Sequence, residues 1–504
     1  MGLLLRLPLF LLLTVVACLA MWVPAVYALA LDDFHDARSF FYSGLLGLIV
    51  AGMVALALAN RATDQSPMRQ LLGLLAGFAF LPVLLAVPFV EAVRNTTFLN
   101  AYVEMLSSLT TTGATLFEPG RLSGPEHLWR ALVGWLGGLL MWIAASAVLA
   151  PLTLGGFEVT ASGEPGQSVV HSAAGSARAS SSVRLARSIE VLVPTYAGLT
   201  LALTVCLLVA GDDPLVAICH AMSVLSTSGI SPIGGVQQSN SGFGGEVLLF
   251  LFMAFALSRL TFSSDTAQAA RRGLYHDPEF RLGIGIVVLV PLALFMRHWV
   301  GAFDVGGEEN LFFGLRALWG GLFTAMSFLT TTGFVSGDWS EAQSWSGLPT
   351  PGIILLALAL VGGGVATTAG GVKLLRVFAL AANGRREIER LVYPSSVGRA
   401  GLVGRRIRRE GAFIAWVFFM LFAVTLAALT LILGIFGIGF DASIMLAIAA
   451  LTNTGPLVAV ASDQALNLLA LAPGAKLALC TAMVLGRLEL LAIIVLLSPE
   501  IWRE

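Results

Sequence analysis

Hydrophobic residues occur along this chain in long uninterrupted runs, and polar residues collect in the loops between them. A helix needs about 20 apolar residues to cross roughly 30 Å of hydrocarbon. The stretches that meet this requirement are approximately 3–30, 39–60, 70–90, 127–152, 185–210, 244–265, 281–300, 350–380, 411–437 and 474–498. The pattern predicts an all-α integral membrane protein with ten transmembrane helices.

The first stretch has a second interpretation, as a signal peptide. Arg6 precedes its apolar run, and Val15-Val16-Ala17-Cys18 weakly resembles a lipoprotein cleavage box. The run continues past Cys18 to Ala30, which is long enough to span a membrane. A membrane helix is therefore favoured.

The composition agrees with a membrane location. The chain has 504 residues, of which 57% are hydrophobic and 12% charged, whereas a soluble chain is typically about 25% charged. The net charge of −1 argues against nucleic acid as a partner. The four cysteines and six histidines show no ligand spacing, and neither His220 nor His276-Asp277 has a nucleophile at helical spacing. We therefore expect no metal site, no disulfide and no enzymatic activity.

Charged residues in the loops predict the orientation, because cytoplasmic loops carry excess Lys and Arg. The most basic loop contains Lys373, Arg376, Arg385, Arg386, Arg390, Arg399, Arg405, Arg406, Arg408 and Arg409, against three glutamates. Alternate loops are acidic, for example around Asp32-Asp33 and Glu308-Glu309. Both termini are then cytoplasmic. The loop 158–182 is rich in Ser, Ala and Gly, which is typical of a flexible connection.

A fourfold repeat lies in the predicted outward-facing loops. In each, a short apolar stretch ends in a hydroxyl-rich tract with a central glycine, and the spacings are 116, 104 and 122 residues. The tracts are Ser107-Ser108-Leu109-Thr110-Thr111-Thr112-Gly113-Ala114-Thr115, Val224-Leu225-Ser226-Thr227-Ser228-Gly229-Ile230-Ser231, Phe328-Leu329-Thr330-Thr331-Thr332-Gly333-Phe334-Val335 and Ala450-Leu451-Thr452-Asn453-Thr454-Gly455-Pro456-Leu457. A single tract could reflect close helix packing, but four at matching places indicate an internal repeat.

These tracts predict a cation filter. Non-helical backbone occurs at membrane depth only where protein buries it or water reaches it. Backbone carbonyls can replace the hydration shell of a monovalent cation, and the absence of carboxylates in the tracts argues against Ca²⁺ or Mg²⁺. The candidate ligands, mainly through backbone carbonyls, are Thr111, Thr112, Gly113, Thr227, Ser228, Gly229, Thr331, Thr332, Gly333, Asn453, Thr454 and Gly455.

At these residues the sequence resembles the membrane subunit of Trk-type potassium uptake systems, the TrkH/KtrB/HKT superfamily. Further resemblances are the start of the helix after the first tract (Trp129-Arg130 to Gly137-Gly138), the junction Asp277-Pro278-Glu279-Phe280, the glycine-rich stretch from Gly362 to Lys373, and the C-terminal Gly486-Arg487-Leu488-Glu489 with Pro499 and Trp502-Arg503. In this superfamily, glycine at the central position of all four tracts accompanies potassium selectivity. The second tract and Pro456 in the fourth depart from the usual pattern.

The resemblance implies four pseudo-repeats of helix, pore helix, filter loop and helix around one pore. The corresponding divisions are 1–60 for two extra N-terminal helices, then 61–155, 156–270, 271–385 and 386–504 for the repeats. It also implies a homodimer in a bacterial inner membrane, gated by a TrkA-like cytoplasmic nucleotide-binding subunit. This chain has no dinucleotide fingerprint, so we expect it to bind K⁺ as the transported ion and no nucleotide.

The eighth stretch contains glycines that disfavour a regular helix. One explanation is a notch where another helix packs closely, and the other is the mobile intramembrane gate that the resemblance implies. The implied gate residues are Gly362, Gly363, Gly364, Thr367, Thr368, Gly370, Gly371 and Lys373. The resemblance also implies that Arg487 faces the pore and acts as a barrier to cations.

The roles of the other intramembrane charges stay open. Lys373 and Arg376 either snorkel to the interface or contact the gate, Glu489 either forms an ion pair or faces the pore, and Arg259 has no assigned role.

The predicted function is uptake of potassium or another monovalent cation. A Na⁺-permeable protein, or a secondary carrier coupled to H⁺ or Na⁺, is the alternative. Proton coupling requires an ionisable residue on the path, and only Arg487, Glu489 and Glu104 lie near it.

Overall fold

The computed structural model describes residues 8–58, 67–150, 154, 181–258, 277–301, 311–347, 350, 352–393, 409–461, 466–490 and 492. Most of the loop 158–182, Arg259, much of the basic loop before Arg409, and both ends of the chain lie outside these residues. Every regular element in the described part is a helix, as expected of an all-α protein.

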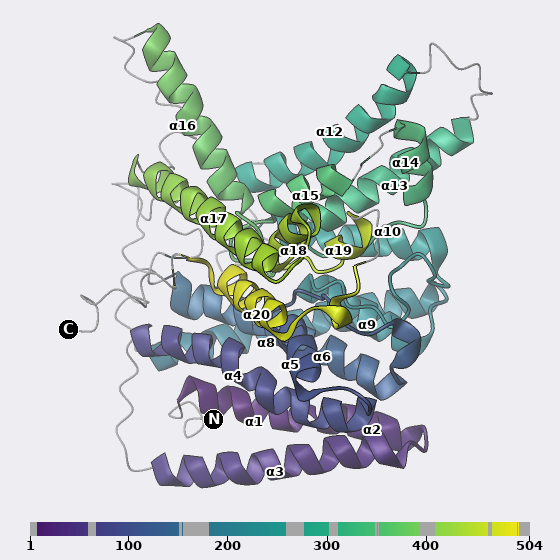
Figure 1. Cartoon of the computed structure of the whole chain (residues 1–504), viewed down its shortest axis with the longest axis vertical. Coiled ribbons are helices and arrows are strands. Elements are labelled where there is room, and N and C mark those ends of the chain that lie inside the picture. The colour runs from purple at the N-terminus through teal and green to yellow at the C-terminus, as the bar shows by residue number, and fades with distance from the viewer. Residues whose placement is uncertain are drawn as a thin grey trace.

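Figure 1 shows the described helices in chain order. Their bounds are α1 Leu9–Ala20, α2 Trp22–Ala30, α3 Phe34–Leu58, α4 Pro67–Val93, α5 Phe98–Leu109, α6 Gly124–Ala144, α8 Ser181–Val209, α9 Pro214–Ser226, α10 Gly242–Met253, α12 Pro278–Gly301, α13 Leu311–Leu329, α14 Trp339–Ser346, α15 Gly352–Val361, α16 Leu374–Val392, α17 Arg409–Ile435, α18 Phe440–Leu451, α19 Leu457–Val460 and α20 Pro473–Leu488. A π-helical turn, Ala145–Leu149, extends α6, and a 3₁₀ turn, Ala254–Leu257, extends α10.

Seven helical stretches of the described chain are long and apolar enough to cross a membrane. They are Leu9–Ala30, Phe34–Leu58, Arg69–Val93, Gly124–Leu149, Val183–Val209, Pro278–Arg297 and Gly411–Ile435. The other three predicted spans correspond to shorter helices in the described residues. These are α10 with its 3₁₀ turn, the pair α15 and α16, and α20. The eighth span is interrupted because its glycines leave the helical conformation after Val361.

The first apolar stretch forms part of the packed structure. It bends at Met21, where α1 ends and α2 begins, and it packs on α3, α4 and α6. Cys18 and Met21 are fully buried in these contacts. Such packing is typical of a membrane helix that belongs to the fold.

Local sequence signals fix several helix starts near the loops. Ser123 caps α6 in a capping box with Glu126, and Pro125 lies in the first turn. Ser123 also donates a 2.7 Å hydrogen bond to Asp36, which ties the start of α6 to the first turn of α3. Helix α9 also begins with a proline in its first turn, Pro214, but its N-cap residue Asp213 forms no side-chain capping bond. These signals help to place the loops around the centre of the molecule.

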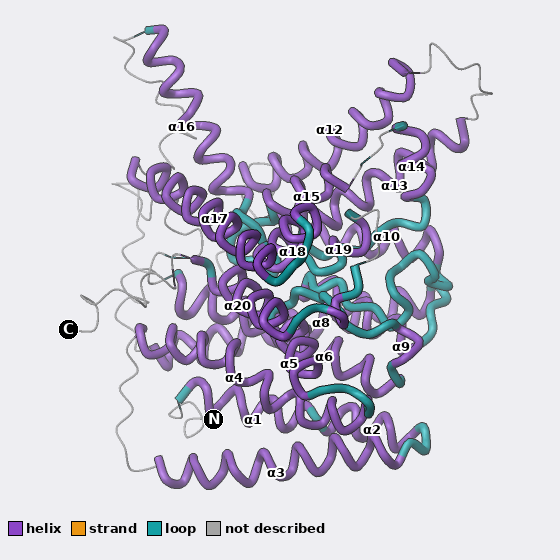
Figure 2. The backbone as a smooth tube through the Cα atoms, viewed as in Figure 1, coloured by secondary structure: helices purple, strands orange, loops and turns teal. Residues whose placement is uncertain are grey.

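The inner helices form a closed ring of contacts. The short helices α5, α9, α13 and α18 alternate with α6, α10, α15 and α20, and each member of the ring packs on the next, with α20 returning to α5. Figure 2 shows loop segments gathered in the middle of the molecule, among these helices. The long helices α3, α12 and α17 lie outside the ring and expose apolar side chains, as expected of surfaces that face lipid.

Candidate ion filter and gate

The four glycine-containing tracts begin where the short helices α5, α9, α13 and α18 end. In each tract the residue two positions before the central glycine has a left-handed backbone. The φ angles are 54° at Thr111, 52° at Thr227, 59° at Thr331 and 54° at Asn453. A positive φ is unusual for a β-branched residue. Its recurrence at equivalent positions shows that the four turns share one conformation.

The same backbone hydrogen bond closes all four turns. The amide of the residue before the central glycine donates to a carbonyl in the last turns of the preceding short helix. The bonds are Thr112 to Ser107 at 2.8 Å, Ser228 to Ser223 at 2.9 Å, Thr332 to Ser327 at 2.8 Å and Thr454 to Ala449 at 2.9 Å. The helix C-termini, which carry partial negative charge, are thereby held at the tracts.

A hydroxyl pair supports each turn. The side chains one and three positions before the central glycine lie within hydrogen-bonding distance of each other, and the earlier of the two also donates to a carbonyl one turn back in the helix. The pairs are Thr110 with Thr112 at 2.8 Å, Ser226 with Ser228 at 3.0 Å, Thr330 with Thr332 at 3.1 Å and Thr452 with Thr454 at 3.1 Å. These hydroxyls are thus engaged with one another and with the preceding helix.

The signs of the φ angles follow a pattern along the tracts. Gly113, Gly229 and Gly333 have φ angles of 71°, 66° and 82°. The residue before each of these glycines has no positive φ, so residues of positive and negative φ alternate along the tract. Alternating backbone conformations of this kind can gather the amides on one side of a backbone segment. Gly455 in the fourth tract does not have a positive φ, so this tract departs from the pattern.

The four tracts contact one another in a closed ring. A Cβ at Gly113 would lie 1.7 Å from the Ser228 carbonyl oxygen, and one at Gly229 would lie 2.2 Å from that of Thr332. The third tract meets the fourth at Pro456, which a Cβ at Gly333 would approach to 2.9 Å. The fourth meets the first through a 2.6 Å hydrogen bond from the Gly455 amide to the Thr112 carbonyl.

The glycine-rich segment 362–373 connects α15 to α16 and lies against this ring. Its two ends pair through hydrogen bonds from the Val372 and Lys373 amides to the Leu360 and Val361 carbonyls, both at 2.9 Å. Gly362, Ala366, Gly371 and Lys373 have positive φ. The segment is therefore a folded intramembrane loop rather than a continuous helix.

The loop contacts the second, third and fourth tracts. The Thr368 hydroxyl donates to the Leu225 carbonyl at 3.2 Å, and the Gly370 amide donates to the Thr331 hydroxyl at 2.7 Å. A Cβ at Gly370 would lie 1.9 Å from the Thr452 carbonyl oxygen. These contacts place the predicted gate residues and the predicted filter residues next to each other.

Arg487 holds the same loop from α20. Its side chain is buried, and Nη1 donates a 2.6 Å hydrogen bond to the Thr368 carbonyl. Its Nε and Nη2 atoms have no hydrogen-bond partner in the described part of the chain. The Lys373 ammonium donates to the Ala369 carbonyl in the loop. Two buried basic side chains, Arg487 from α20 and Lys373 from the loop itself, therefore donate to carbonyls of the loop.

Arg376 and Glu489, two further buried charges in the described residues, form an ion pair. Arg376 Nη2 lies 2.5 Å from Glu489 Oε2, and the guanidinium lies 3.8 Å from the centre of the Phe418 ring. Snorkelling of Lys373 and Arg376 to the interface does not occur, since Lys373 is 6% and Arg376 0% exposed. The reason is that the helix breaks before them, so they lie inside the protein and not at the end of a span.

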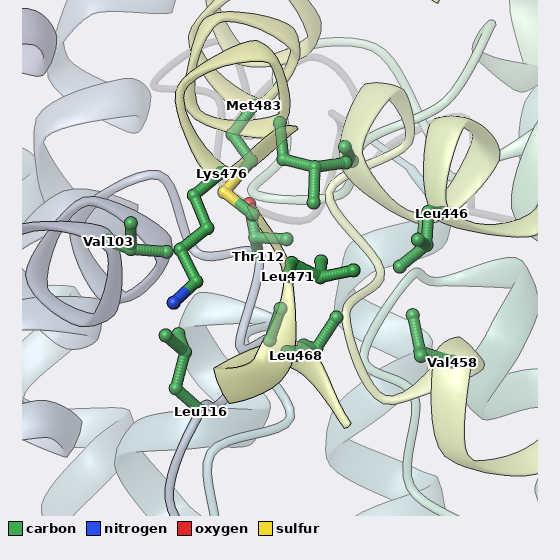
Figure 3. Close-up of a pocket in the computed structure, with 13 residues that line it drawn as sticks. Val103, Thr112, Leu116, Leu446, Val458, Leu468, Leu471, Lys476 and Met483 are labelled. Carbon is green, nitrogen blue, oxygen red and sulfur yellow. The ribbon is translucent and has the colours of Figure 1, made fainter. Parts of the chain in front are cut away.

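Sequence reasoning named Glu104 but missed its partner, and it missed Lys476 altogether. Glu104 pairs with Arg130 at 2.6 Å, and Lys476 donates to Asn100 at 2.8 Å and to the Leu469 carbonyl at 2.9 Å. Lys476 borders a pocket beside the first and fourth tracts (Figure 3). Isolated charges within apolar stretches were the available signal. Their partners come from distant parts of the chain, so the sequence did not identify the pairs.

Comparison with known proteins agrees with this arrangement. The family model described as "TrkH: Cation transport protein" matches residues 314–503. The chain is 28% identical over 500 residues to the Trk system potassium uptake protein TrkH of Escherichia coli, which covers 96% of this chain and 96% of that protein. It is 30% identical over 420 residues to the protein of the same name from Halomonas elongata, covering 80% of each chain.

A solved structure is similar over the whole chain. The crystal structure of the potassium transporter TrkH from Vibrio parahaemolyticus matches with a TM-score of 0.79 and 25% sequence identity, and the match covers 100% of both chains. The matched proteins are ion transporters, which confirms the expectation that this chain is not an enzyme. The chain belongs to the family of Trk potassium uptake transporters.

Proposed function

We propose that this protein carries K⁺ across the bacterial inner membrane through a filter of backbone carbonyls. The observation that carries the proposal is the closed ring of four tracts that share one backbone turn, each at the C-terminal end of a short helix. Carbonyls presented from four sides, with negative helix ends behind them, favour a dehydrated monovalent cation. The similar proteins are named potassium uptake proteins, which supports K⁺ as the ion carried.

The pore is built from four repeats, at 61–155, 156–270, 271–385 and 386–504, after two additional helices in 1–60. The ring in which α5, α9, α13 and α18 alternate with α6, α10, α15 and α20 supports this division. The proposed ion ligands are the twelve tract residues named from the sequence. The positive-inside distribution supports cytoplasmic termini.

The loop 362–373 is the proposed gate, with Gly362, Gly363, Gly364, Thr367, Thr368, Gly370, Gly371, Lys373 and Arg487 as its functional residues. Its hydrogen bonds to Leu225 and Thr331 support a position that blocks the pathway below the ring. Opening requires that these bonds break and that the Arg487 charge moves away from the axis.

A homodimer regulated by a TrkA-like cytoplasmic nucleotide-binding subunit completes the proposal. In the described residues, α16 extends beyond the rest of the molecule (Figure 1) and exposes Ile388, Leu391 and Val392. An apolar face of this kind is usually covered by a protein partner. The second protomer is the proposed cover, and the basic residues on the same helix are available to the cytoplasmic subunit.

The alternative is a coupled carrier in the same superfamily. Proton coupling needs an ionisable group that is free to exchange a proton on the path. Glu104 is paired with Arg130, and Glu489 is paired with Arg376. Both carboxylates are therefore committed to structural ion pairs, which favours passive, channel-like conduction over proton coupling.

Uptake of radioactive Rb⁺ into proteoliposomes tests the proposal. Uptake should follow the membrane potential, should be inhibited by external K⁺ far better than by Na⁺, and should change when the nucleotide-binding subunit is added. A pH gradient alone should drive no uptake. Equal inhibition by Na⁺ would support the Na⁺-permeable alternative, and uptake driven by the pH gradient would support the carrier.

A further inference from the structure

The position nine residues before the central glycine has a different side chain in each tract. It is Glu104 in the first, His220 in the second, Thr324 in the third and Leu446 in the fourth. The three polar residues are 0% exposed. A fully buried polar side chain is stable only when it forms hydrogen bonds. The hydrogen-bond partner of this side chain therefore indicates which segment of the tract it holds in place.

In the first tract the partner lies in the residues that follow the central glycine, here called the exit of the tract. Glu104 accepts a 2.8 Å hydrogen bond from the amide of Leu116, three residues after Gly113. Its other carboxylate oxygen lies 2.6 Å from Nε of Arg130 on α6. Glu104 thus joins the short helix to the exit of the tract through a charge-assisted hydrogen bond, which is stronger than a neutral one, and to the following long helix through an ion pair.

The third tract has the same bond with neutral chemistry. The Thr324 hydroxyl accepts from the amide of Ser336, three residues after Gly333, at 3.3 Å. Glu246 on α10 supports the same segment, because it accepts from the Ser336 hydroxyl at 2.7 Å and from the Gly337 amide at 2.6 Å. The exit of this tract is held from two helices.

The second tract reaches an equivalent result by another route. The residue three positions after Gly229 is Pro232, which has no amide hydrogen to donate. His220 instead pairs with the Ser231 hydroxyl at 2.9 Å, and the Ile233 amide donates to that same hydroxyl at 3.2 Å. The buried histidine therefore holds the exit through one serine.

The fourth tract has no such bond. Leu446 occupies the position, and the residue three positions after Gly455 is Val458, whose amide donates to the Gly455 carbonyl at 3.1 Å in the start of α19. Leu446 and Val458 line the pocket in Figure 3. Ala449 lines it too, at a position where the other three tracts have serine. Among the described residues, α18 supplies no polar side chain to the exit of its own tract.

We propose that Glu104, His220 (through Ser231) and Thr324 are positioning residues for the first, second and third tracts, which form three walls of the filter. They keep these walls from contracting around a smaller cation. The fourth tract forms the fourth wall, which is the one able to move. The inference rests on the proposed potassium function. A carbonyl cage discriminates against Na⁺ only if it resists closing on it, whether cavity size or dipole repulsion provides the resistance. Three anchored exits supply that resistance. The pocket between the first and fourth tracts leaves room for movement, and of these two tracts only the fourth lacks a polar anchor.

The test compares Thr324→Val, which removes the acceptor at almost constant volume, with Thr324→Ser, which keeps it. The readout is the ratio of K⁺ to Na⁺ concentrations that halve Rb⁺ uptake into proteoliposomes, measured on monodisperse protein. Thr324→Val should lower K⁺ preference about fivefold, as expected for one lost hydrogen bond, and Thr324→Ser should restore it. The matched fourth-wall variant Leu446→Met should leave the ratio unchanged.

The outcomes separate this proposal from the proposed function. If the unmodified protein shows no K⁺ preference, the proposed function fails. If it shows one and Thr324→Val retains it at normal uptake, the anchoring role is overturned. Should Thr324→Val not fold, Ser231→Ala provides the same comparison at the second tract, because it removes the hydroxyl that joins His220 to the Ile233 amide. A loss of preference in Leu446→Met equal to that in Thr324→Val would also overturn the distinction between the walls.

Discussion

A left-handed backbone conformation is energetically unfavourable for threonine. Nevertheless, three of the four tracts have a threonine in this conformation two positions before the central glycine, and the fourth has Asn453. Such conformations cost about 1–3 kcal/mol each and persist only where the surroundings fix them. Here the amide that follows is bonded to the helix, and the neighbouring hydroxyls pair with each other. The sequence shows the hydroxyl residues and the glycines clearly, but not this torsion, because local propensity opposes it.

At the scale of single residues, a substitution of Arg487 tests the proposed gate. Replacement by alanine removes both the bond to the Thr368 carbonyl and a buried positive charge beside the loop. Charge-assisted bonds contribute about 1.5–3 kcal/mol, so we expect Rb⁺ flux to rise about tenfold. The exposed Arg385→Ala is the control and should leave flux unchanged. Unaltered flux in Arg487→Ala would remove this residue from the gate.

The Arg376–Glu489 pair has a structural consequence that can be measured separately. Glu489→Gln replaces a carboxylate that contacts the buried Arg376 guanidinium by a neutral amide, which should lower the free energy of unfolding by about 2 kcal/mol or more. Glu389→Gln, at the exposed pair with Arg385, should cost about 0.5 kcal/mol or less. Denaturation of the purified protein in detergent measures both. Equal stability of the two variants would contradict a buried structural pair.

At the scale of elements, the glycine-rich loop depends on close backbone approach. A Cβ at Gly363 would lie 2.8 Å from the Ala256 carbonyl oxygen, and one at Gly364 would lie 2.6 Å from that of Leu257. No side chain fits between the loop and the end of α10 without displacing one of them. The sequence predicted an interrupted span here, but the resemblance to a family, and not the periodicity, predicted a gate.

The double substitution Gly363→Ala with Gly364→Ala should therefore weaken docking of the loop. We expect Rb⁺ flux to change by about threefold or more, while the K⁺/Na⁺ ratio stays the same, because the four tracts are not altered. Gly434→Ala on α17 is the control, since a Cβ there meets no atom within 4 Å. A changed ratio with normal flux would assign these glycines to the filter instead.

At the scale of the whole molecule, the tracts from four distant parts of the chain close one ring. Gly113 and Ser228 lie so near each other that the ring has no room for a methyl group at Gly113. We expect Gly113→Ala to lower K⁺ preference over Na⁺ by at least about tenfold, since clash and torsional strain act together. Gly120→Ala, in open space, is its control. Competition between K⁺, Na⁺ and Rb⁺ in proteoliposomes measures both.

Prediction from the sequence succeeded where a signal was local and failed where it was not. Apolar runs identified the long helices, and the repeated tracts identified the turns at Thr111 and its counterparts. The partners of Glu104, Arg376 and Lys476 come from other helices, so no window of sequence contains both members of these pairs. Ten spans were predicted and seven long apolar helices occur in the described part of the chain, because glycines break one predicted stretch and two others extend outside the described residues.

The hydrogen bond from the Gly455 amide to the Thr112 carbonyl has an electrostatic consequence. A carbonyl oxygen has two lone pairs, and here one of them is already directed at a proton of the neighbouring tract. We therefore expect the first tract to present a weaker negative potential at this level than the second and third tracts. A cation bound between the tracts as proposed would then lie off the geometric axis, closer to those two, so that a fourfold repeated chain would produce an asymmetric field.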